Sequence, residues 1–105
     1  MDNETIKRHV NILEEMTECI KTRLDCAVID RVEDFYQKDC DLVIRRININ
    51  RGTSNYQVAF SWSGLIEGHT GRMPVHMIVD IHNAICSNYL RSILDELAGQ
   101  RSIEP

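Results

Sequence analysis

Four arginines lie in the middle of the chain with almost no acidic residue to oppose them. They are Arg45, Arg46, Arg51 and Arg72. Residues 42–79 contain only one acid, Glu67, so this segment carries a net charge of +3. Residues 1–41 carry −5 and residues 80–105 carry −2, so the basic segment lies between two acidic ones. Guanidinium groups donate paired hydrogen bonds to phosphate or carboxylate oxygens, so the chemistry indicated is anion binding.

A glycine-containing stretch beside the last of these arginines extends the candidate site. Gly68, His69, Thr70 and Gly71 precede Arg72, an arrangement that imitates a phosphate-binding loop but lacks the full G-x-x-x-x-G-K-[ST] pattern. The candidate binding residues are therefore Arg45, Arg46, Arg51, Arg72 and His69. In the alternative interpretation, these arginines lie on a solvated face of the sheet, and acidic residues of the N-terminal helix neutralise their charge.

Two further side chains have a spacing that suits a metal ion. His82 and Cys86 are four residues apart, so on a helix both could reach one ion. No second ligand pair has a recognisable spacing, and neither C-x-x-C nor H-E-x-x-H occurs. We therefore expect no metal, and interpret the pair as residues at the edge of an apolar stripe. The cysteines, likewise, are interpreted as reduced, small apolar residues; they are Cys19, Cys26, Cys40 and Cys86.

Catalytic residue types are present but not in a catalytic pattern. Ser61, Ser63, His76, His82 and Asp80 would supply a nucleophile, a base and an acid. However, no strand–turn–helix elbow surrounds a serine or a cysteine. We predict that the protein is not an enzyme and uses no cofactor.

The segment from Asn3 to Leu24 is predicted to be an amphipathic helix. Its apolar residues recur every three or four positions, which places them on one stripe. They are Ile6, Val10, Leu13, Met16, Ile20 and Leu24. Most of the charged residues between them, including Glu14, Glu15 and Glu18, fall on the opposite face.

The middle of the chain has the alternation of β-strands. Tyr56, Val58, Phe60 and Trp62 alternate with smaller residues, which predicts a strand over 55–65 whose bulky side faces the core. A second strand is expected over 42–50, joined to it by a turn at Gly52. A first strand is expected over 27–36, although residues 24–35 also match helical spacing.

The C-terminal part begins ambiguously and then becomes helical. Residues 75–81 alternate as a strand would, but Pro74 also suits the first turn of a helix. From His82 onward the apolar spacing predicts a helix that ends at Gly99. Residues 100–105 are expected to be a frayed tail, which leaves 1–99 as one domain.

Together these elements predict an α+β fold. A three- or four-stranded antiparallel sheet would carry an N-terminal and a C-terminal helix on one face, in α-β-β-β-α order. The chain of 105 residues has no run of apolar residues long enough for a membrane span and no signal-peptide pattern, so we expect a cytoplasmic protein. The predicted function is a non-enzymatic protein-binding module that acts as a homodimer: an adaptor, regulator or inhibitor of the kind that phages and mobile elements encode. The alternative is a nucleic-acid-binding protein that uses the basic hairpin.

Overall fold

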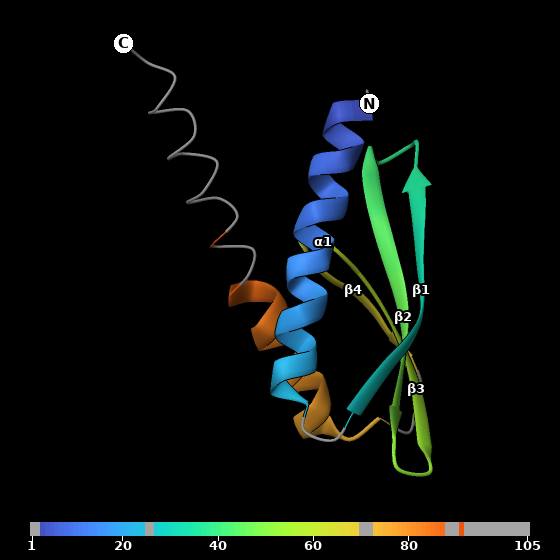
Figure 1. Ribbon diagram of the computed structural model, residues 1–105, viewed down its shortest axis with the longest axis vertical. Helices are drawn as coiled ribbons and strands as arrows, with labels where there is room; N and C mark the ends of the chain where they lie inside the picture. The colour runs from blue at the N-terminus through green and yellow to red at the C-terminus, as the bar shows by residue number, and fades with distance from the viewer. Residues whose placement is uncertain (1–2, 25–26, 70–72, 88–90, 92–105) are drawn as a thin grey trace.

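The computed structural model of the protein describes residues 3–24, 27–69, 73–87 and 91, with side chains omitted at 67–69. One helix and four strands follow each other along the chain, before a C-terminal helix over residues 75–87. Their bounds are α1 Asn3–Arg23, β1 Ala27–Gln37, β2 Leu42–Arg51, β3 Ser54–Ser61 and β4 Gly64–His69. The strands form one antiparallel sheet, with α1 and the C-terminal helix on the same side of it (Figure 1). The predicted α+β fold is confirmed, with the fourth strand present.

Helix α1 packs on the sheet through the stripe that its spacing predicts. Leu13, Met16, Ile20 and Leu24 are buried, and Ile6 and Val10 pack against them from the N-terminal half. Glu4 in the first turn and Lys21 and Arg23 in the last turn complement the helix dipole. Helix formation and burial of the stripe therefore favour the same conformation.

The four strands run in the order β1-β2-β3-β4, so each strand pairs with its neighbour in sequence. Gly52, with φ +62°, allows the tight turn between β2 and β3. The first strand forms at Ala27–Gln37, as expected, and not as a continuation of the helix. Within the described residues, no helix is both long and apolar enough to cross a membrane.

Strand β1 contains a bulge at its centre. The pairing with β2 shifts between Asp30 and Glu33, and Arg31 takes a left-handed φ of 49°. The carboxylate of Asp30 accepts a hydrogen bond of 2.8 Å from the backbone N–H of Arg31, which offsets part of the strain. Because two residues of β1 oppose one of β2, the side chains after the bulge switch faces.

The expected strand over 55–65 is divided into two. Trp62 and Ser63 form a turn, and the chain reverses there into β4. The Trp62 ring still faces the helix side, where it stacks on His9 of α1 with 5.5 Å between ring centroids. Alternation alone could not reveal this turn, because Trp62 continues the phase of the strand.

The two faces of the sheet differ in what covers them. Register places Tyr56, Val58 and Phe60 on the same face as Ile49, Ile47 and Arg45, and this face lies under the helices. The expectation that the aromatic side faces the helices is confirmed.

The opposite face is less open than the sequence suggested. Ala59 and Ser61, two of the smaller residues that alternate with the aromatic ones, are both buried. Ala59 pairs in register with Arg46, so its short side chain lies below a much longer neighbour. Ser61 shares a hydroxyl contact of 2.7 Å with Ser63 across the turn.

Residues 75–81 form the first turns of the C-terminal helix and not a strand. The backbone N–H groups of Met77 and Ile78 donate to the carbonyl of Pro74, which starts the helix. Met77 and Ile81, one turn apart, are buried, whereas Val75 and Val79 are exposed. The 3.6-residue period therefore decides the fold here, and the alternation is incidental. The predicted stop at Gly99 and the tail lie outside the described residues.

A tyrosine near the end of β1 bonds to the turn that leads into β2, and we expect it to titrate late. Tyr36 donates a 2.8 Å hydrogen bond to the carboxylate of Asp41, which raises the pKa of Tyr36 above its ordinary value. Because the folded-state pKa is raised, this contribution to stability is present at neutral pH and is lost as pH rises through that pKa. Asp41→Asn should lower the pKa of Tyr36, and asparagine tolerates the φ of 53° found there. NMR titration of ring-labelled tyrosine measures the shift; an unchanged Tyr36 curve would contradict it.

Candidate functional site

Arg45, one of the predicted anion-binding residues, lies inside the protein. It is only 2% exposed, in the middle of β2, on the face that α1 covers. Its neighbours on the same side of the strand are Val43 and Ile47, both buried. A guanidinium group in such surroundings requires hydrogen-bond acceptors from the protein itself.

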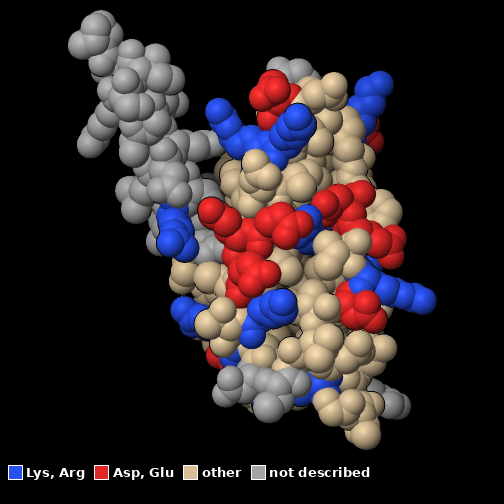
Figure 2. Space-filling model, in the orientation of Figure 1, with Lys and Arg blue, Asp and Glu red and all other residues tan. Residues whose placement is uncertain are grey.

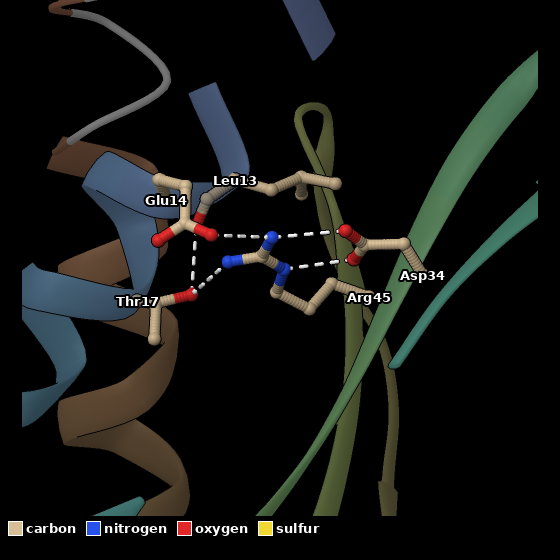
Figure 3. A network of polar contacts seen from close by, with 5 residues as sticks. All are labelled: Leu13, Glu14, Thr17, Asp34 and Arg45. Carbon is tan, nitrogen blue, oxygen red and sulfur yellow. Dashed lines mark hydrogen bonds and ion pairs between the residues drawn. The ribbon is translucent and has the colours of Figure 1, made fainter. Parts of the chain in front are cut away.

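Two carboxylates and one hydroxyl supply those acceptors (Figure 3). Asp34 of β1 receives two bonds, 2.8 Å from Nε and 2.9 Å from Nη2. Glu14 of α1 accepts from Nη2 at 2.8 Å, and the hydroxyl of Thr17 accepts from Nη1 at 3.2 Å. Thr17 in turn donates to the backbone carbonyl of Leu13 at 2.7 Å. One arginine therefore joins the helix to two strands of the sheet.

The charge of Arg45 is stable in this setting. Burial acts to lower the pKa of Arg45, but the hydrogen bonds to Asp34 and Glu14, with their negative charges, outweigh it and raise the pKa above its usual value. Asp34 pairs with Arg45 in the β1–β2 register, so the bidentate contact is fixed by the sheet itself. The alternative interpretation of the basic segment holds only in part for Arg45: Glu14 of α1 neutralises its charge as expected, but Asp34 of β1 does so as well, and the side chain is buried and not solvated.

The surrounding surface is acidic. Acidic side chains gather across the middle of the face over α1, with basic side chains above and below them (Figure 2). Glu14, Glu15 and Glu18 border a shallow hollow beside α1 together with Arg91. The buried positive charge of Arg45 therefore lies beneath carboxylates, a poor position for attracting a phosphate.

The other predicted binding residues do not join Arg45. Arg46 points to the opposite face, where its guanidinium carbon lies 5.2 Å from the ring centroid of Phe35. Arg51 is exposed at the end of β2. His69 ends β4 without a described side chain, and Arg72 lies outside the described residues. Among the described members, no single basic face is formed.

Sequence reasoning missed the acceptors of Arg45, although one signal was present. Arg45 falls in the phase of Val43 and Ile47, so strand alternation alone placed it inward. A charged residue at an inward position implies an acidic partner. Which acids these are depends on how α1 lies on the sheet, because Glu14 and Thr17 are distant in sequence from Asp34 and Arg45.

A second feature is the exposure of the edge strand β1. Seven large apolar side chains of the described residues are exposed, and four of them belong to this strand. They are Val28, Val32, Phe35 and Tyr36. Strand β1 is the first in the sheet order, so only one of its two backbone edges pairs with a strand, which is β2. Among the described elements, no strand pairs with the other edge.

A third feature is the contact between His82 and Cys86. Cys86 Sγ lies 3.4 Å from His82 Nε2, and both residues are exposed on the C-terminal helix. The expectation that Cys86 packs as a small apolar residue is wrong, and the same holds for Cys40, which is exposed in a turn. No group of three metal-ligating side chains occurs in the part of the chain that the structure describes.

Comparison with known proteins gives no assignment. Neither the protein-family models nor the curated proteins nor the solved structures contain a match to this chain.

Proposed function

We propose that the protein is a non-enzymatic protein-binding module that forms a homodimer through β1. The observation that supports this most directly is the concentration of exposed apolar side chains on one edge strand. An unpaired strand edge offers backbone donors and acceptors to another strand, and natural proteins usually protect such edges. In β1 the charges and the bulge lie at the centre, with Val28 and Phe35 on either side. Such an arrangement opposes indiscriminate pairing and permits a specific partner.

A second copy of this chain fits the charge of that edge. Strand β1 has an excess of two acidic residues, and Arg45 and Arg46 of β2 balance it across the register. Two copies can therefore approach each other without net repulsion at the edge. Antiparallel pairing about a two-fold axis near Val32 and Glu33 would bring Arg31 of each copy beside Asp34 of the other.

The apolar stripe of α1 does not provide an alternative dimer surface. Its members Leu13, Met16 and Ile20 have no exposed surface, because they form the core with β2 and β3. Of the large apolar side chains that remain exposed among the described residues, most belong to β1. The proposed dimer therefore extends the sheet and does not pair helices.

Sedimentation velocity with two matched variants tests the proposal. Val32 and Val79 are similarly exposed, at 45% and 48%, but lie on β1 and on the C-terminal helix. We expect the wild-type protein to be a dimer in the micromolar range and Val32→Lys to be a monomer, because a buried lysine at the edge loses its hydration. Val79→Lys should remain a dimer. A wild-type protein that is monomeric at high micromolar concentration would contradict the proposal. Equal effects of both variants would exclude β1 as the dimer interface.

The nucleic-acid alternative can be separated in the same preparation. Arg46 and Arg51 are the exposed arginines that remain of the predicted basic face among the described residues. If the protein bound phosphates, affinity for mixed-sequence DNA or RNA would fall steeply with salt and would decrease in Arg46→Ala/Arg51→Ala. We expect no binding at low salt.

A further inference from the structure

We propose that His82 and Cys86 form a binding site for a soft divalent metal ion such as Zn²⁺. The two residues are four apart on the C-terminal helix, and their ligand atoms, Nε2 and Sγ, already face each other at 3.4 Å. Imidazole nitrogen and thiolate sulfur are the ligands that Zn²⁺ prefers. This site is independent of the proposed dimer surface on β1.

The separation of the two atoms matches one edge of a zinc tetrahedron. Zn–N distances of about 2.0–2.1 Å and a Zn–S distance of about 2.3 Å, at a tetrahedral angle, place nitrogen and sulfur about 3.6 Å apart. The observed 3.4 Å differs from this by an amount that a small side-chain rotation removes. The helix therefore holds both ligands close to their bound positions, which reduces the entropy lost on binding.

Both side chains lie at the surface of the helix, and the contact between them has hydrogen-bond geometry. His82 and Cys86 are both exposed, whereas Ile81 and Ile85 of the same helix are buried. Exposure also leaves the metal open to further ligands. On binding, the thiol proton of Cys86 is released to solvent and a sulfur–metal bond replaces the S–H bond, with no change of oxidation state.

Two of the four coordination positions remain for ligands from outside the pair. Water molecules can fill both, giving one metal ion per chain. The same pair from a second copy can also fill both, giving one metal ion per two chains with two histidines and two cysteines. Both cases use the same chelate, and the stoichiometry distinguishes them.

Titration with Co²⁺, which reports thiolate ligation by its near-ultraviolet charge-transfer absorption, tests the site in the full chain. We expect this absorption in the wild-type protein and its loss in Cys86→Ser. Competition with a chromogenic zinc chelator should give a Zn²⁺ affinity at least about tenfold weaker in Cys86→Ser and in His82→Ala, because each variant retains one ligand. The stoichiometry from the same titration shows whether one or two chains hold the ion.

Two variants on the same molecule serve as controls. Cys40→Ser removes another exposed cysteine, and His76→Ala removes another exposed histidine of the same helix. Both should retain the charge-transfer absorption and the Zn²⁺ affinity. Absence of the absorption in the wild-type protein, its survival in Cys86→Ser, or its loss in Cys40→Ser would overturn the proposal. Circular dichroism confirms that each variant is folded.

Discussion

Phe60→Ala is expected to lower the free energy of unfolding by about 3–5 kcal/mol. The Phe60 side chain has no exposed surface and lies in the core cluster between the sheet and the helices. Truncation removes a whole ring from water-excluded surroundings and leaves a cavity that neighbouring side chains fill only in part. Urea denaturation followed by circular dichroism measures the loss.

Phe35→Ala is the matched control for this variant. It removes the same ring from the adjacent part of the sheet, but Phe35 is 38% exposed and faces away from α1. The decrease in the free energy of unfolding of the monomer, which includes the loss of the contact with Arg46, should be below about 1 kcal/mol. Equal losses at Phe60 and Phe35 would show that the two faces of the sheet are assigned wrongly.

Arg45→Met should lower the free energy of unfolding by about 3 kcal/mol. Breaking a buried ion pair by removing one partner costs about 3–5 kcal/mol, because the other charge remains without compensation. The side chain of Asp34 is 28% exposed and that of Glu14 is 61% exposed, so both carboxylates regain some hydration, which places the effect at the lower end. The methionine retains most of the length of arginine, so the cavity contribution stays small.

Two further variants isolate the cause. Arg46→Met removes the neighbouring, exposed guanidinium and should cost below about 1 kcal/mol. The double variant Arg45→Met/Asp34→Leu should be more stable than Arg45→Met by at least about 1 kcal/mol, since it removes the uncompensated carboxylate as well. A double variant no more stable than the single one would mean that Arg45 acts through packing and not through its charge.

The sequence predicted most of the fold because its apolar periods are regular. The stripe of α1, with Leu13, Met16 and Ile20 on one face, admits one helical phase, and burial confirms it. The inward positions of Val58 and Phe60 follow equally from strand alternation. Periodicity failed where two periods coincide, as at residues 75–81, and at Trp62, where a turn keeps the phase of the strand.

The candidate sites were less predictable, because they depend on contacts between distant segments. The arginine cluster was visible as composition, but composition does not tell on which face of a strand each residue lies. Arg45 and Arg46 are adjacent in sequence, yet one is buried against α1 and the other is exposed above Phe35. The four-residue spacing of His82 and Cys86 can be read from the sequence, whereas the exposure of the two side chains cannot.

The sequence by itself determined that α1 is helical and which of its faces is buried, and it put Arg45 in the same strand phase as Val43 and Ile47, since these depend on periods within single segments. The tertiary structure alone decided that Asp34, Glu14 and Thr17 surround that arginine, because their meeting requires α1 to lie across β1 and β2. It also decided that β1 lies at the edge with its apolar side chains exposed. Strand order and helix docking arise from packing between segments, so patterns within a single segment do not predict them.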